Sequence, residues 1–263
     1  MQNKNNFEKK EDSGVDIILP NYNKGYFLQE TLNSIFSQTY KNWNLILIDD
    51  NSQDDSKNII EHHKSYNKNI NVIYLKKNKG VAFCRNLGIR LSNSKYISFI
   101  DSDDYWTKDK LKEQVDFMEK FKYVFTYTNY TPFVLKKGKK IFKKEIIVPS
   151  SFNYDKFVNN TSIGMSSVMI ERSIIKTIRF KKIKICEDYL FKCEILKKNN
   201  HAMGFNQNTM YYQISKNSLQ SNKLRNLYWM WYINKKYNHM SLFKNLKSLL
   251  FIVISSIKRY GIK

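Results

Sequence analysis

The chain has 263 residues, of which 42% are hydrophobic and 15% aromatic, enough for one α/β domain with a substantial core. With 8 glycines and 3 prolines, the composition excludes a disordered chain and an all-β repeat. The 45 basic and 23 acidic residues give a net charge of +22, which favours a polyanionic partner such as nucleic acid, anionic lipid or a phosphorylated substrate.

Strands and helices alternate along the first hundred residues. Apolar runs predict strands, and apolar residues at helical spacing predict helices, in the order strand 15–20, helix 25–38, strand 43–48, helix 52–65, strand 70–75, helix 79–91 and strand 95–100. Ser52 is expected to cap the second helix, and Thr107 a further helix at 108–120. Units of this kind form parallel sheets with right-handed crossovers, and such sheets bind ligands beyond the carboxyl ends of their strands.

Polar clusters follow three of these strands, at residues 20–23, 49–52 and 101–104. The last cluster contains three carboxylates, which repel one another and are costly to desolvate unless a cation lies among them. Hard oxygen ligands suit Mg²⁺ or Mn²⁺, which bind carboxylates together with a substrate's phosphates. An acidic turn before a helix is the plain alternative, but the convergence of three clusters favours a nucleotide site. Neither G-x-G-x-x-G nor G-x-x-x-x-G-K-[ST] occurs, so metal and basic side chains are expected to hold the phosphates.

The second half is predicted to begin with a strand at 122–129. It continues, in order, with a hairpin over 131–149, a short helix at 152–160, a strand at 166–170 and a helix at 171–178. Glu187 and Asp188 open a further helix, where the helix dipole favours carboxylates whatever their function. The residues alone therefore leave the role of this pair open.

The C-terminal region carries no Asp or Glu after Glu194. Its apolar residues fill one helical stripe about 140° wide: Leu242, Phe243, Leu246, Leu249, Leu250, Val253, Ile254 and Ile257. A basic amphipathic helix suits the surface of an anionic membrane, and packing on the chain's own domain or on a partner subunit is the alternative. We favour membrane association through residues 242–259.

Several motifs, in this order, resemble the family 2 inverting glycosyltransferases, strongly over residues 14–120 and more loosely to about 215. The matching segments are 15–23, 37–40, 48–52, 78–86 and 101–104. The resemblance implies the GT-A fold, a Rossmann-like mixed sheet flanked by helices, and a nucleotide-diphosphate sugar as donor. We therefore predict a lead-in at 1–13, a glycosyltransferase domain at 14–215 with a nucleotide-sugar half (14–120) and an acceptor half (121–215), and a helical extension at 216–263.

The resemblance also assigns nucleotide contacts. Pro20 and Tyr22 match the turn that packs on the uracil ring, and Asn23 is expected beside them. Asp50 matches the carboxylate that accepts a hydrogen bond from the ring N–H of the base, and Arg85 matches a basic position near the nucleotide.

Asp101 and Asp103 form the family's D-x-D motif, with Ser102 between them. One carboxylate is expected on the ribose side and the other on a divalent ion, Mn²⁺ or Mg²⁺, that bridges the diphosphate. Asp104 is a further candidate ligand.

Asp188 matches the general base that deprotonates the acceptor hydroxyl in a single displacement, and Glu187 and Trp106 are expected to contact the acceptor. The chain departs from the family at Gln213, where Arg is usual. Three nearby basic residues can substitute there: Lys216, Lys223 and Arg225.

The function expected from this resemblance is transfer of a hexose or N-acetylhexosamine from a UDP-sugar to a growing surface glycan such as lipopolysaccharide, O-antigen or capsule. The acceptor is a glycan or lipid-linked glycan, and the enzyme is expected in the cytoplasm, peripheral on the inner face of the cell membrane. Cys84, Cys186 and Cys193 lack ligand spacing and fit buried thiols in a reducing compartment. Residues 1–13 show no signal peptide, and no run of about 18 apolar residues predicts a spanning helix.

Three other functions compete with this one. A nucleotidyltransferase would use the same carboxylates, but the glycine-rich, lysine-bearing entry loop is missing. A nucleic-acid-binding protein fits the charge, but no helix-turn-helix, zinc-ligand or RNP-like pattern occurs, so no nucleic acid is expected. A catalytically inactive scaffold conflicts with the intact acidic motifs.

Overall fold

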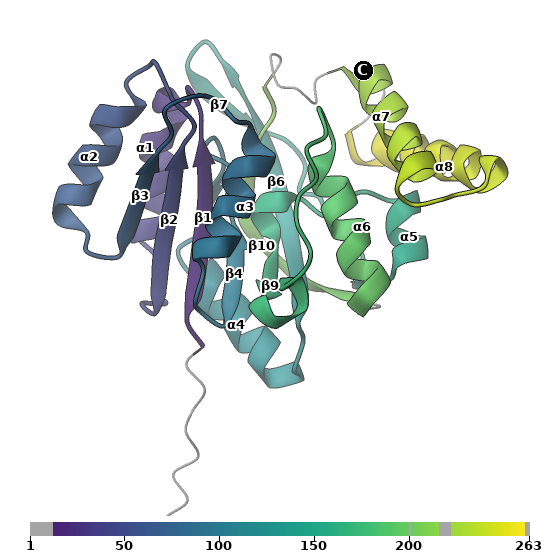
Figure 1. Cartoon of the computed structure of the whole chain (residues 1–263), viewed down its shortest axis with the longest axis horizontal. Helices are drawn as coiled ribbons and strands as arrows, with labels where there is room; N and C mark the ends of the chain where they lie inside the picture. Colours follow the sequence, from purple (N-terminus) through teal and green to yellow (C-terminus); the bar gives the residue numbers. More distant parts are fainter. Residues whose placement is uncertain (1–12, 200, 216–221, 261–263) are drawn as a thin grey trace, which may run out of the picture.

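The computed structural model describes residues 13–199, 201–215 and 222–260. Its ten strands form one sheet with helices packed on its faces (Figure 1). The strands are β1 (Val15–Asn21), β2 (Trp43–Asp49), β3 (Ile70–Tyr74), β4 (Tyr96–Phe99), β5 (Tyr105–Trp106), β6 (Phe125–Lys136), β7 (Lys139–Phe142), β8 (Ser151–Phe152), β9 (Met169–Glu171) and β10 (Ala202–Gln213). The α-helices are α1 (Gly25–Phe36), α2 (Ser56–Tyr66), α3 (Val81–Leu91), α4 (Lys110–Phe121), α5 (Tyr154–Asn159), α6 (Glu187–Asn199), α7 (Lys223–Lys236) and α8 (Leu242–Tyr260).

The first four long strands are parallel and lie in the order β3-β2-β1-β4. Every residue of β1 is buried, because helices cover both faces of a parallel sheet and leave no polar side to alternate with. Helix α3 comes unusually close to β1 at Gly88, where an added Cβ would lie 2.5 Å from Cγ2 of Ile18. This half of the sheet brings the carboxyl ends of β1, β2 and β4 to one edge.

The sheet continues into the second half of the chain and becomes mixed. Strand β9 is antiparallel to β4 and to β6, whereas β10 runs parallel to β6 with two register shifts between Phe205 and Met210. The short strand β5 pairs with β10, so the two predicted halves share one sheet. The mixed α/β sheet confirms the predicted fold class.

Several local predictions are wrong. Helix α2 begins at Ser56, and Ser52 instead donates a hydrogen bond to Asp49 in the turn before it. Helix α4 begins at Lys110, not after Thr107. The predicted strand at 122–129 begins only at Phe125 and continues into the predicted hairpin as the single strand β6, which turns tightly into β7, so the hairpin itself is present.

Further along the chain, the predicted helix at 171–178 is only a 3₁₀ helix at Arg172–Ile175. The predicted strand at 166–170 is a 3₁₀ helix at Met165–Ser167 followed by β9. The long strand β10 was missed because its residues 202–213 mix exposed and buried positions without strict alternation.

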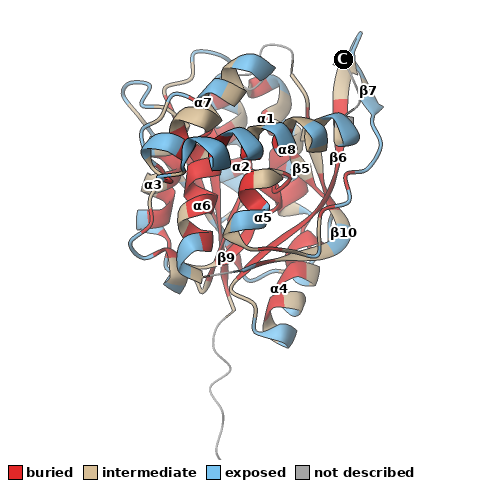
Figure 2. Cartoon of the chain, turned by 90° about the vertical axis from the view of Figure 1, so that its right-hand side faces the viewer, coloured by how far each residue is buried: buried red, intermediate tan, exposed pale blue. Residues whose placement is uncertain are grey.

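The core is one cluster of buried side chains between the sheet and its helices (Figure 2). The three cysteines are buried free thiols, which confirms that part of the prediction. Among the described residues, no helix is long and apolar enough to cross a membrane. Most of the predicted lead-in, residues 1–12, lies outside the part of the chain that the structure describes.

Candidate active site

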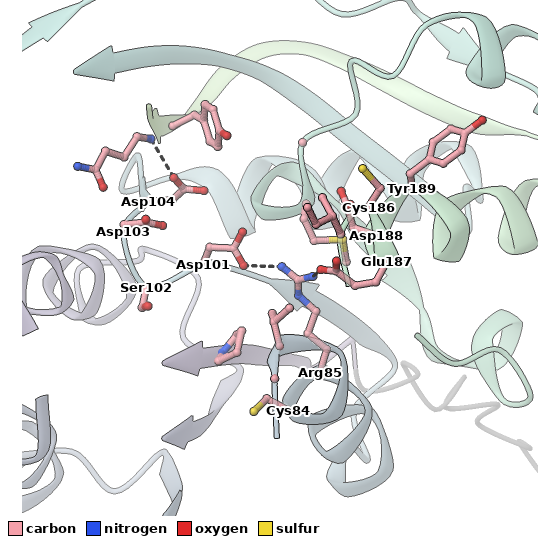
Figure 3. A pocket seen from close by; sticks show the side chains of 18 of the residues that line it. Cys84, Arg85, Asp101, Ser102, Asp103, Asp104, Cys186, Glu187, Asp188 and Tyr189 are labelled. Carbon is pink, nitrogen blue, oxygen red and sulfur yellow. Dashed lines mark hydrogen bonds and ion pairs between the residues drawn. The ribbon is translucent and has the colours of Figure 1, made fainter. Parts of the chain in front are cut away.

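A cavity of about 670 Å³ opens at the carboxyl ends of β1, β2 and β4, and the start of α6 closes its opposite side (Figure 3). Ten of the side chains predicted from the sequence line this one cavity: Pro20, Tyr22, Asp50, Arg85, Asp101, Ser102, Asp103, Asp104, Glu187 and Asp188. The three polar clusters and the Glu-Asp pair therefore face the same space. These ten residues span 168 positions of the sequence.

Asp50 follows β2 and is almost fully buried at the cavity wall. Its two carboxylate oxygens accept hydrogen bonds from the backbone N–H groups of Lys79 and Gly80, each at 2.7 Å. Gly80 has a φ of +87°, which glycine adopts without strain, and α3 begins at the next residue. Asp50 thus fixes the loop before α3, and a carboxylate that accepts two hydrogen bonds can still accept others at the cavity wall.

The turn after β1 carries an exposed aromatic ring. Tyr22 is 46% exposed and lines the cavity, where its ring is available to stack on a planar ligand. Asn23 does not belong to the described cavity lining, contrary to the prediction. Its side-chain oxygen accepts a hydrogen bond from the N–H of Gln53 (2.7 Å), and its own N–H donates to Oγ of Ser52 (2.9 Å). Asn23 therefore links the turns after β1 and β2.

Arg85 lies between two carboxylates that come from distant parts of the sequence (Figure 3). Its guanidinium donates to Asp101 at 2.6 Å and to Glu187 at 2.8 Å, and its side chain is 4% exposed. Burial lowers the pKa of Arg85, but Asp101 and Glu187 outweigh burial and raise it, so the cation is retained. Burial raises the pKa of Glu187 despite its pairing with Arg85. Arg85 therefore joins the acidic motif to the start of α6.

The three carboxylates of the acidic motif do not converge on one point. Asp103 pairs with Nζ of Lys24 at 2.6 Å, whereas Asp104 accepts hydrogen bonds from Oγ of Ser166 (2.6 Å) and the N–H of Gln213 (3.0 Å). Burial raises the pKa of Asp103 and, more strongly, that of Asp104. Asp104 holds three segments of the chain together, and both of its carboxylate oxygens accept structural hydrogen bonds.

The structure also tests how a divalent ion would fit. Within the described parts of the chain, no three His, Cys, Asp or Glu side chains are grouped so that they could hold a metal ion. Asp103 already faces a cation, the ammonium of Lys24, and it lines the cavity. Mg²⁺ and similar ions need only one or two carboxylates when substrate phosphates complete the ligand set. Asp103, with Asp101 beside it, fits such an ion.

Asp188 lies in the first turn of α6 and accepts a hydrogen bond from Nζ of Lys192 at 2.8 Å. Lys192 is buried and also donates to the carbonyl oxygen of Ile163 at 2.8 Å. Burial raises the pKa of Asp188, but Lys192 and Arg85 outweigh it and lower the pKa below its usual value. Asp188 is therefore an ionised carboxylate in the cavity, as a proton acceptor must be.

Some predicted residues lie elsewhere, and others were missed. Trp106 is buried, donates its indole N–H to the carbonyl oxygen of Ser166 (2.8 Å), and is absent from the described cavity wall. Lys216, predicted to substitute for the usual arginine, lies outside the described residues. Helix α7 lines the cavity through Asn226 and Met230. The missed residues include Lys24 and Lys192. The second could have been found from its spacing, because residues four apart on a helix are neighbours.

The mixed sheet, with carboxylates after the carboxyl ends of its parallel strands, has the fold of the GT-A glycosyltransferases. Residues 16–180 match the family model described as "Glycosyl transferase family 2". The chain belongs to this family.

Its relatives support the assignment over most of their length. The chain is 31% identical over 230 residues to the "Putative teichuronic acid biosynthesis glycosyltransferase TuaG" of Bacillus subtilis. The aligned region covers 88% of this chain and 90% of that protein. It is 34% identical over 221 residues to the "UDP-Glc:alpha-D-GlcNAc-diphosphoundecaprenol beta-1,3-glucosyltransferase WfaP" of Escherichia coli, with 81% and 82% covered. The crystal structure of S. aureus TarS 1-349 in complex with UDP shares the fold, with a TM-score of 0.69, 18% identity, and 93% of this chain and 72% of that chain covered.

Proposed function

We propose that this protein is an inverting glycosyltransferase that moves a hexose or N-acetylhexosamine from a UDP-sugar to a glycan or lipid-linked glycan during surface polysaccharide synthesis. One observation carries the proposal: Asp50, the acidic motif and Asp188 line a single cavity. The relatives named for teichuronic acid synthesis and for a diphosphoundecaprenol acceptor support the same kind of reaction.

The donor would lie along the strand ends. Asp50 has free lone pairs to accept the ring N–H of uracil, and the half-exposed ring of Tyr22 offers a stacking face. The diphosphate would extend toward Asp101 and Asp103. Mn²⁺ or Mg²⁺, held there by Asp103, would offset the negative charge of the departing diphosphate. Lys24 forms an ion pair with Asp103. When the diphosphate is bound, Lys24 could pair with a phosphate in place of Asp103.

Asp188 would remove the proton from the acceptor hydroxyl. Its ionised form is held by Lys192 and Arg85, and its position at the start of α6 sets it across the cavity from the strand ends. Attack from that side, opposite the leaving diphosphate, inverts the anomeric centre. Glu187 lies beside Asp188, so the two carboxylates repel each other. The ion pair between Glu187 and Arg85 offsets this repulsion.

The place of action would be the inner face of the cell membrane, where a lipid-linked acceptor and a UDP-sugar meet. The acceptor named for the Escherichia coli relative and the basic helical segment at 242–259 support this location.

A thermal-shift screen of nucleotide sugars tests the proposal. A UDP-sugar at about a hundred times its Kd is expected to stabilise the protein by about 2.7 kcal/mol, more in the presence of Mn²⁺ or Mg²⁺ than with a chelator. Asp50→Asn is expected to lose most of this stabilisation. Turnover would release UDP from the sugar donor, whereas a nucleotidyltransferase would release pyrophosphate from a nucleoside triphosphate. A chain that binds no UDP-sugar, or that releases only pyrophosphate, contradicts the proposal.

A further inference from the structure

The C-terminal helix α8 packs on the protein through polar side chains. Asn245 and Ser248 are each 1% exposed. Asn245 donates to the carbonyl oxygen of Trp231 (3.0 Å) and accepts from the side chain of Asn234 (3.1 Å), while Ser248 donates to the carbonyl oxygen of Val158 (2.5 Å). Hydrogen bonds to α7 and to the end of α5 therefore hold this helix in place.

The outward side of α8 is apolar, the reverse of an ordinary surface helix. Seven large hydrophobic side chains on it are between 39% and 76% exposed: Leu242, Phe243, Leu246, Leu250, Phe251, Ile254 and Ile257. Helix α8 lies across one end of the molecule with much of its outward side exposed (Figure 2). Packing of this stripe on the chain's own domain, the alternative to a membrane or a partner subunit, would bury these residues, but the described parts of the chain leave them exposed.

Basic residues border this apolar face. At about 100° per residue, all of the exposed hydrophobic residues except Phe251 fall within an arc of about 120°, and Lys247, Lys258 and Lys244 follow along one edge of it. Residues 195–263 contain no acidic residue that could neutralise them.

The charge pattern decides what covers this face. A second copy of the chain would carry the same net charge of +22, and its own C-terminal region has no acidic residue to pair with these lysines, so like charges would repel. A bilayer with anionic headgroups offers an apolar interior for the leucine and phenylalanine side chains and phosphates for the lysines. We infer that the outward face of α8 is a docking surface for the interfacial region of an anionic lipid bilayer.

The docking surface is tied to the catalytic cavity. Helix α7 contributes Asn226 and Met230 to the cavity wall, and its Asn234 accepts a hydrogen bond from the hydroxyl of Tyr189 at 2.7 Å. Tyr189 is the neighbour of Asp188 on α6. Docking would thus hold the α7 side of the cavity near the lipid surface. This consequence for a lipid-linked acceptor rests on the proposed function, whereas the docking itself does not.

Vesicle flotation of the full chain tests the inference. The probes are vesicles of phosphatidylcholine alone and of phosphatidylcholine mixed with phosphatidylglycerol. We expect binding to the mixed vesicles and at least about tenfold weaker binding for the triple variant Leu246→Gln, Leu250→Gln, Ile254→Gln, since burying even one leucine is worth about 1.5 kcal/mol. The triple variant Lys244→Gln, Lys247→Gln, Lys258→Gln is expected to lose the preference for phosphatidylglycerol.

Two controls separate the possible outcomes. Phe121→Gln with Ile141→Gln removes exposed apolar side chains from α4 and β7, and should leave vesicle binding unchanged. Transfer to a short water-soluble acceptor should be unaffected by the α8 variants, so a failure of the docking surface is distinguishable from a failure of the proposed reaction. Equal vesicle binding by the wild type and the triple variant Leu246→Gln, Leu250→Gln, Ile254→Gln would overturn the inference. A wild-type dimer in sedimentation analysis that becomes a monomer in this triple variant would also overturn the inference, because it would show that a second copy covers the face.

Discussion

The ion pair between Lys192 and Asp188 makes the most informative target for substitution. The two side chains are 4% and 18% exposed, and their atoms lie 2.8 Å apart. At an effective dielectric constant of about 20, this separation corresponds to a gross attraction of about 6 kcal/mol, which the desolvation of both ions largely offsets. When one partner is removed, the other remains buried and desolvated without the attraction. This lowers the free energy of unfolding by about 3–5 kcal/mol.

Lys192→Met is therefore expected to lower the free energy of unfolding by about 3 kcal/mol at neutral pH. It should also raise the pKa of Asp188, because burial is then opposed only by Arg85 and by the backbone N–H of Tyr189. In the wild type the lowered pKa stabilises the fold above the unfolded pKa of Asp188, and this contribution is lost as the pH falls through the folded value. The difference in unfolding free energy between wild type and variant should accordingly narrow as the pH falls, first through the raised pKa of Asp188 in the variant and then through the lowered pKa in the wild type.

Urea unfolding and the pH dependence of kcat/KM measure these effects. Asp188→Asn and the double variant with Lys192→Met complete a double-mutant cycle, in which the double variant should be more stable than the sum of the single losses by about 2 kcal/mol. The acid limb of the pH profile should move to higher pH in Lys192→Met. Lys198→Met, an exposed position on the same helix, is the control and should stay within about 0.5 kcal/mol. Additive energies together with an unmoved acid limb would refute the reasoning.

Two further substitutions test the scaffold of the site. Arg85→Met leaves Asp101 and Glu187 without their shared cation, so a loss of about 3 kcal/mol in urea unfolding is expected, partly restored by adding Glu187→Gln; a variant as stable as wild type would contradict the buried bridge. Gly88→Ala places a Cβ 2.5 Å from the side chain of Ile18, so we expect a loss of about 1–3 kcal/mol, which exceeds the gain of about 1 kcal/mol in helix propensity. A raised melting temperature for Gly88→Ala would show that α3 does not pack as closely on β1 as the structure describes.

The strand-end carboxylates were predictable because they depend on local signals. An apolar run followed by polar residues marks the end of a strand, and parallel strands in βα units end at the same edge. Asp50 and Asp101 could thus be placed together, and the family resemblance added Asp188. The cavity that all three line is consistent with this reasoning.

Other features depended on contacts that no local pattern encodes. Arg85 meets Glu187 across 102 positions, and Asp104 meets the backbone of Gln213 across 109. Sequence reasoning grouped Asp104 with its neighbours as a metal ligand, but burial against Ser166 and Gln213 gives it a structural role. Periodicity was equally insufficient in α8, where it located the apolar stripe and left its direction open. The polar face packs inward because its side chains have hydrogen-bond partners there. Asn245 donates to the carbonyl oxygen of Trp231, and Ser248 donates to that of Val158.

The single-turnover rate of sugar transfer by Asp188→Asn, measured beside its affinity for the UDP-sugar, tests the central claim most directly. A carboxylate that takes the acceptor's proton contributes about 10²–10⁴-fold to the rate, so we expect a loss of that size with donor affinity nearly unchanged. Transfer at the wild-type rate by a folded Asp188→Asn protein would contradict the assignment of the base and the account built on it.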